Sequence, residues 1–152
     1  MDKPDPRKAV AEEDHETLVN IYQHILDRLL AFVPPASQPK LINEFDVPFF
    51  AQLLRHKQFN WTSLHGLTNT TFDWVHNLQM PLRDSATAQA RQRVLRCTNM
   101  VEAVGTYVDE VHGVIDTMQQ DMGEFYNYMD HPVVQEMLKQ AIEHNCSQCK
   151  PK

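Results

Sequence analysis

This sequence has few of the features that mark secreted proteins, membrane proteins or enzymes. Its three cysteines are an odd and small number, which argues against a disulfide framework. No apolar run approaches the roughly 18 residues that a transmembrane helix needs. The polar N-terminus also lacks the apolar core of a signal peptide. We therefore expect reduced thiols, no membrane partner and a location in the cytosol or nucleus.

Catalytic signatures are missing as well. The sequence has no G-x-S-x-G elbow, no phosphate loop and no dinucleotide fingerprint. Its net charge of −6 argues against broad binding to nucleic acid or to an anionic membrane. We expect a protein that is not an enzyme, and an enzyme with an unrecognised site stays the third-ranked alternative.

Glycine is scarce and the nine prolines are unevenly placed. Only four glycines occur, and no proline lies between Leu82 and His131. No run of alternating β-branched residues predicts a strand, so the fold class is all-α. A length of 152 residues fits one helical domain spanning 1–152, with flexible tails at 1–6 and 145–152.

A heptad stripe is the strongest pattern present. Apolar residues recur every seven positions in two columns: Val94, Val101, Val108, Ile115 and Met122, and Cys97, Val104, Val111, Met118 and Phe125. In a chain that is 42% hydrophobic, ten chosen positions would all be apolar only about 2 times in 10,000. The stripe predicts one long helix at about 85–128.

A third apolar column accompanies the stripe at Met100, Tyr107 and Val114, and no charged pairing code flanks it. A two-stranded coiled coil keeps its seam to two positions in seven, whereas a three-in-seven face fits a helix bedded against several neighbours. The sequence thus predicts an elongated bundle of five or six helices built around the long helix. An intermolecular coiled coil, including self-association, is the alternative.

Shorter helices are expected elsewhere, at residues 7–32, 40–45, 48–57, 61–67, 70–80 and 132–143. Asp46 and Asp130 are the predicted N-caps of the helices that begin at Pro48 and Pro132. Gly66 and the polar run 68–71 suggest a break between the fourth and fifth of these segments.

Charge is distributed unevenly along the long helix. Arginines cluster at its start, and no lysine or arginine occurs from Cys97 to Leu138, where all eight formal charges are acidic. This order opposes the helix dipole. The acidic stretch is either a surface that meets a basic partner or a solvated face.

These features favour an interaction module, an adaptor or subunit that binds partner helices or peptides through apolar helix faces. Aromatic residues crowd the segment 45–74, where they form either the bundle core or an exposed patch. We select six candidate partner-binding residues because large apolar side chains anchor interfaces. They are Phe59, Trp61, Trp74, Met118, Met122 and Phe125.

A zinc-binding domain is the second-ranked alternative. His144, Cys146 and Cys149 form an H-x-C-x-x-C motif, which supplies three ligands of the type that zinc prefers. The alternative is that these residues belong to a frayed tail whose thiols have no ligand role, because a single motif of this kind near a terminus also occurs by chance. Apart from this zinc alternative, no cofactor is expected.

Overall fold

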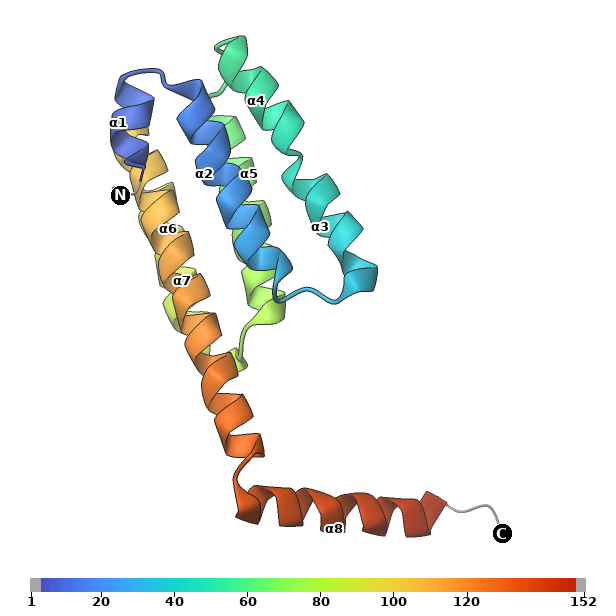
Figure 1. Cartoon of the computed structure of the whole chain (residues 1–152). Coiled ribbons are helices and arrows are strands. Elements are labelled where there is room, and N and C mark those ends of the chain that lie inside the picture. The colour runs from blue at the N-terminus through green and yellow to red at the C-terminus, as the bar shows by residue number, and fades with distance from the viewer. Residues whose placement is uncertain (1–3, 150–152) are drawn as a thin grey trace. The chain divides into compact units, whose positions relative to one another are not determined.

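The protein is all-α in the computed structural model, as the sequence predicts. The structure describes the backbone of residues 4–149 and the side chains of residues 4–141. Its helices outnumber the five or six expected, and Figure 1 shows them in chain order. They are α1 (Pro6–Ala11), α2 (His15–Leu30), η1 (Pro35–Ser37), α3 (Gln38–Phe45), α4 (Val47–Arg55), α5 (Trp61–Leu78), η2 (Pro81–Arg83), α6 (Asp84–Leu95), α7 (Met100–Met129) and α8 (Pro132–Cys149).

The chain divides into two compact units, Met1–Asp116 and Thr117–Lys152, and the single domain at 1–152 stays a prediction. The boundary falls within α7. No helix in the described part of the chain is both long enough and apolar enough to cross a membrane.

The predicted helix at 7–32 is wrong in one respect, because the structure divides it into α1 and α2. Glu13 adopts a left-handed conformation with φ 55° and ends α1. Asp14 then caps α2, and its carboxylate accepts hydrogen bonds from the amide and hydroxyl of Thr17. An aspartate N-cap satisfies an amide that a continuous helix would bond to its own backbone.

The segments around α4 and α5 give one confirmed cap and one correction. Asp46 caps α4 by accepting the amide hydrogen of Phe49, as expected. The predicted break at 68–71 is wrong, since α5 is continuous. Thr68 and Thr71 are fully buried, and their hydroxyls donate to the carbonyls of the preceding turn. The helix itself satisfies these polar groups, so they need no loop.

The long helix predicted at 85–128 is also two helices. α6 ends at Leu95 and α7 begins at Met100, and the side chain of Asn99 accepts hydrogen bonds from the amides of Val101 and Glu102. The apolar stripe continues across this break because α6 and α7 each turn one face toward the core.

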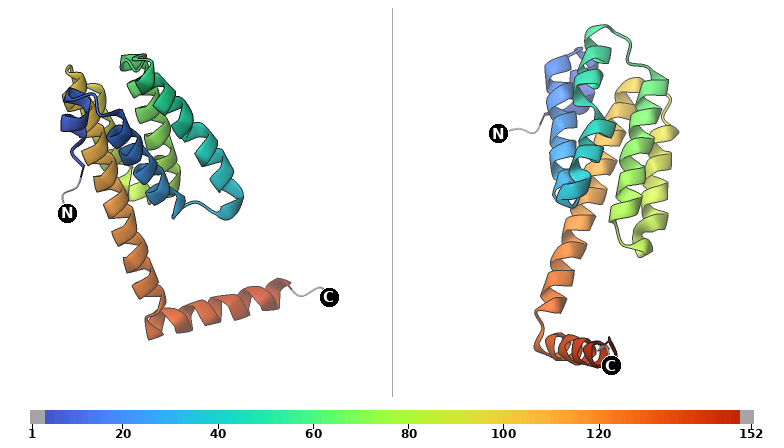
Figure 2. Two further views of the ribbon diagram at one scale, coloured as in Figure 1. Left: turned by 45° about the horizontal axis from the view of Figure 1, so that its top comes forward. Right: turned by 90° about the vertical axis from the view of Figure 1, so that its right-hand side faces the viewer.

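In the first unit, the N-terminal part of α7 lies beside α1, α2, α5 and α6, as Figures 1 and 2 show. Ion pairs join this helix to its neighbours: Arg7 on α1, Arg28 on α2 and Arg93 on α6 each bind carboxylates of α7. α5 contributes a buried hydrogen bond between Thr71 and Tyr107. The core consists of apolar side chains from all of these helices, among them Ile25, Leu29, Leu41, Leu64, Phe72, Val75, Val94, Val111 and Ile115. The expectation that the stripe forms the wall of a bundle is therefore confirmed for this part of α7.

The second unit consists of the end of α7 and all of α8. The predicted cap at Asp130 is wrong, because the described side chain that bonds the first turn of α8 is His131, whose Nδ1 accepts from the amide of Val133 at 3.2 Å. Val134 is buried, whereas Val133 and Met137 are exposed.

Candidate functional site

Exposure changes abruptly along the apolar stripe of α7. The exposed fraction is 0% at Ile115 and 5% at Met118, and it rises to 38% at Met122 and 57% at Phe125. These four residues are three or four positions apart and therefore lie on one face of the helix. One helix face is thus buried at one end and open to solvent at the other.

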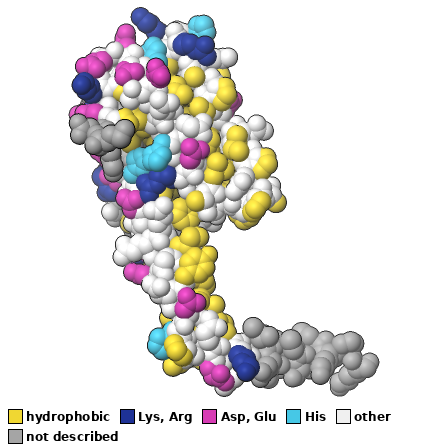
Figure 3. Space-filling model, in the orientation of Figure 1, with side chains coloured by type: hydrophobic (Ala, Val, Ile, Leu, Met, Phe, Trp, Pro, Cys, Tyr) yellow, Lys and Arg dark blue, Asp and Glu magenta, His cyan; other side chains and the backbone are white. Residues whose placement is uncertain are grey.

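Large exposed apolar side chains are concentrated in the second unit. Six of the ten such residues in the described chain lie there, although the described part of this unit is only residues 117–141. They are Met122, Phe125, Tyr126, Tyr128, Val133 and Met137. Figure 3 shows hydrophobic side chains along this end of α7. We call these six residues the apolar surface.

Acidic residues differ between the two units in how they are paired. In the first unit, Arg7 binds both Glu102 and Asp109 of α7. Arg28 binds Asp116, and Arg93 binds Glu110. In the second unit, Glu124, Asp130 and Glu136 are exposed, and none of them makes an ion pair within residues 4–141. Within residues 4–141, three carboxylates of the second unit are therefore exposed and outside these ion pairs.

The candidate anchors in the first unit are partly buried rather than exposed. The indole N–H of Trp74 donates to Glu44, which joins α5 to α3. The ring of Trp61 lies 5.8 Å from that of His65 on the same helix. The three aromatic candidates, Phe59 included, are half-buried, so the sequence pattern did not distinguish residues that join helices from residues that remain open to a partner.

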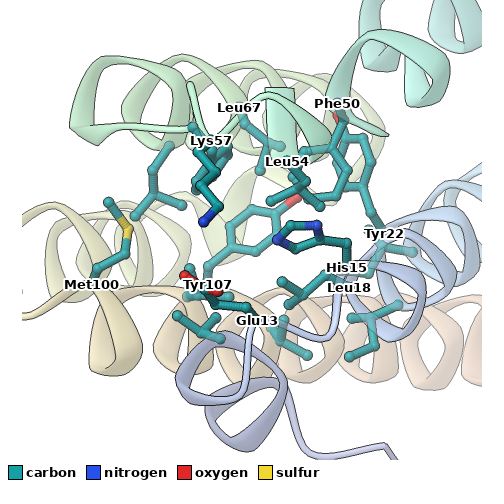
Figure 4. Close-up of a pocket in the computed structure, with 17 residues that line it drawn as sticks. Glu13, His15, Leu18, Tyr22, Phe50, Leu54, Lys57, Leu67, Met100 and Tyr107 are labelled. Atoms are coloured by element: carbon teal, nitrogen blue, oxygen red, sulfur yellow. The ribbon is translucent and has the colours of Figure 1, made fainter. Parts of the chain in front are cut away.

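A pocket of about 280 Å³ lies among α2, α4, α5 and α7 in the first unit. Seventeen residues line it (Figure 4), and all but Glu13, His15 and Lys57 have apolar or tyrosine side chains. Ile25 and Leu64 in its wall are buried, whereas Glu13 and Lys57 are exposed, so the charged residues mark its mouth. We call this cavity the bundle pocket.

Two residues at the mouth have left-handed backbones. Glu13 follows α1 and Lys57 follows α4, with φ 55° and 54°. In both, the residue after them bonds back across the helix end: the Asp14 amide to Ala9, and the Gln58 amide to Leu53, at 2.8 Å each. This is the Schellman arrangement, in which glycine is the usual left-handed residue. Neither residue could be singled out from the sequence, because a left-handed backbone leaves no signal there when the residue is not glycine or asparagine.

The polar groups inside the bundle pocket are already bonded. The Tyr22 hydroxyl donates to the carbonyl of Phe45 at 2.8 Å, and the Tyr107 hydroxyl lies 2.8 Å from that of Thr71. Burial raises the pKa of both tyrosine hydroxyls, so they stay protonated. The interior of the pocket therefore presents apolar surface, and its free charges are at the mouth.

The candidate zinc ligands lie outside the described side chains. α8 extends to Cys149, but the side chains of His144, Cys146 and Cys149 are among residues 142–152, and the zinc alternative stays a prediction. In the part of the chain with described side chains, no three or more histidine, cysteine, aspartate or glutamate residues gather as a metal site.

Comparisons with known proteins give no relative. No protein-family model matches the chain, and no curated protein or solved structure is significantly similar to it. Functional conclusions therefore rest on the residues of this chain alone.

Proposed function

We propose that this chain is a non-enzymatic protein-interaction module, an adaptor or subunit of a larger assembly, located in the cytosol or nucleus. The observation that carries the proposal is the exposure of Met122 and Phe125 on the α7 face that is buried at Ile115 and Met118. Large apolar side chains that cluster on a surface mark sites where another protein excludes water. Met122, Phe125 and Tyr126 are exposed neighbours on α7, and the other three residues of the apolar surface lie within the next eleven positions.

The partner element that best fits this surface is an amphipathic helix with basic flanks. Apolar residues three and four positions apart, such as Met122, Phe125 and Tyr126, accept the apolar side chains of a second helix. Residues 117–141 contain four acids and one lysine, a net formal charge of −3. Lysine or arginine beside the partner's apolar stripe would pair with the exposed carboxylates of Glu124 and Glu136.

Affinity capture with matched variants tests this proposal. The test variant is Met122→Gln with Phe125→Gln, and the control is Leu82→Gln, which removes an exposed apolar side chain from the first unit. We expect the wild type and the control to capture a partner protein that the double variant does not capture. Cross-linking should map its contact to a basic amphipathic helix. A synthetic peptide of that helix should bind the purified chain at least tenfold more weakly after the double substitution, and more weakly in high salt.

Two results would contradict the proposal. Capture of the same proteins by the wild type and the double variant would show that the apolar surface binds none of them. Light scattering that reveals a dimer of the wild type, dissociated by the double variant, would show that the surface is covered by a second copy of this chain.

A further inference from the structure

The bundle pocket has a size and a charge pattern that suit a small ligand. Its walls come from helices far apart in the sequence, including α2, α4, α5 and α7, and its interior is apolar. From this we propose that the bundle pocket binds a small amphiphilic anion, a medium-chain carboxylate whose alkyl chain fills the cavity and whose head group binds Lys57. The pocket lies in the first unit, so this inference is independent of the proposed partner surface.

The volume sets the length of the ligand. A dry apolar cavity of about 150 Å³ holds benzene, a molecule of six carbon atoms. The bundle pocket, at about 280 Å³, is nearly twice as large. By this scale it holds about a dozen non-hydrogen atoms, which is the size of decanoate. Longer fatty acids would leave several methylene groups outside the cavity.

The charges at the mouth set the head group. In Figure 4, the side chains of Lys57, in the turn after α4, and His15, at the start of α2, point toward the space between the walls. Neither residue makes an ion pair in the part of the chain with described side chains. An ammonium and an imidazole N–H both donate hydrogen bonds to a carboxylate. Glu13 also lines the mouth, two residues before His15, so its negative charge opposes an anion on the α1–α2 side and leaves Lys57 as the main contact of the head group.

The backbone at Lys57 gives a second, independent argument. Its left-handed conformation is one that glycine adopts without steric cost and that lysine adopts with strain. Because the Schellman end of α4 does not require a side chain at this position, the lysine is not explained by the fold. Its position at the pocket mouth, with the ammonium directed inward, is explained by binding of an anion.

Calorimetric titration of the full chain tests the ligand class with three probes of equal chain length: decanoate, decan-1-ol and decylamine. We expect decanoate to bind one-to-one and to raise the melting temperature, because a ligand of the native state stabilises it. Decan-1-ol and decylamine should bind at least tenfold more weakly. The absence of decanoate binding, or tighter binding of decylamine than of decanoate, would overturn the proposal.

Two variants locate the site, and a third is the control. Lys57→Gly should weaken decanoate binding at least tenfold and leave decan-1-ol binding unchanged, in a protein at least as stable as the wild type because glycine relieves the strained backbone. Val104→Phe should block both ligands by filling the pocket, which its half-buried side chain lines. Lys40→Gln, on an exposed part of α3 that does not line the pocket, should bind decanoate as the wild type does. Unchanged decanoate affinity in both pocket variants would show that the ligand binds elsewhere.

Discussion

Arg7 of α1 lies directly over Gly105 of α7. A Cβ atom built at position 105 would come within 2.5 Å of the Cγ, Nε and Cζ atoms of Arg7. From this position Nε of the guanidinium donates to Glu102 at 3.1 Å, and Nη1 donates to Asp109 at 3.0 Å. The absence of a side chain at Gly105 therefore allows one arginine to bridge two carboxylates that lie two helical turns apart.

This relationship predicts a specific coupling between the two positions. Alanine is about 1 kcal/mol more favourable than glycine inside a helix. Gly105→Ala should show this gain only in an Arg7→Ala background, because in the wild-type background the new methyl group displaces Arg7 from both carboxylates. Urea unfolding of the wild type, the two single variants and the double variant measures the coupling.

Gly113→Ala is the matched control, since nothing lies within 4 Å of a Cβ atom built there. It should stabilise α7 by about 1 kcal/mol whether or not Arg7 is present. Equal effects of Gly105→Ala in both backgrounds would show that Arg7 does not depend on the missing side chain.

Truncation should destabilise the protein at the buried end of the apolar stripe and have little effect at the exposed end. Ile115→Ala leaves a cavity in a fully buried site and should lower the free energy of unfolding by about 2–5 kcal/mol. Phe125→Ala removes a larger side chain, yet it should change this free energy by less than about 0.5 kcal/mol because Phe125 is exposed. Chemical denaturation checks both values. Comparable losses in the two variants would mean that Phe125 is covered in the isolated protein.

These results show which parts of the fold the sequence could predict. The helical class and the buried face around Ile115 follow from a periodicity of three and four residues, which is a local property of the chain. The helix breaks were missed because they depend on single caps, Asp14 and Asn99, within segments whose apolar spacing continues. The false break in α5 has the opposite cause: Thr68 looks like a loop residue until its hydroxyl is seen to bond its own helix.

The sequence could place those candidate residues that belong to a local pattern, but not those whose position depends on contacts between helices. Met122 and Phe125 extend a local pattern, so the sequence could place them on one helix face, and their role in binding stays a prediction. Trp74 could not be assigned from sequence, because its partner Glu44 lies on another helix. The bundle pocket was not predictable, because its walls form only when distant helices pack together.

The buried hydrogen bond between Thr71 and Tyr107 predicts different losses of stability for removing its donor and for removing its acceptor. Thr71 has one hydroxyl hydrogen, which it donates to the carbonyl of Leu67 at 2.9 Å, so Tyr107 must be the donor in the bond between the two side chains. Tyr107→Phe leaves Thr71 bonded and should cost about 1 kcal/mol of stability. Thr71→Val leaves a buried tyrosine hydroxyl without its acceptor and should cost more, about 1–3 kcal/mol.

The double variant distinguishes this account from a simple packing effect. Thr71→Val combined with Tyr107→Phe removes both polar groups, so it should be more stable than Thr71→Val alone. Thermal or urea unfolding of the three variants gives the order. A double variant less stable than Thr71→Val would show that the orphaned hydroxyl is not the source of the cost.

The Asp14 cap of α2 makes the stability of the protein depend on pH. Hydrogen bonds from the hydroxyl and the amide of Thr17 lower the pKa of the Asp14 carboxyl below its ordinary value of 3.8. Since the folded state favours the carboxylate, its contribution to stability is complete above the unfolded pKa and is lost as the pH falls through the lower folded pKa. Asp14→Asn keeps a capping oxygen but cannot titrate, so this part of the acid dependence should disappear from unfolding curves between about pH 2 and 6.

An NMR titration of the Asp14 carboxyl should have its midpoint below 3.8 in the wild type, and Thr17→Val should move the midpoint upward by removing the hydroxyl donor. A wild-type midpoint at or above 3.8 would show that these bonds do not favour the carboxylate.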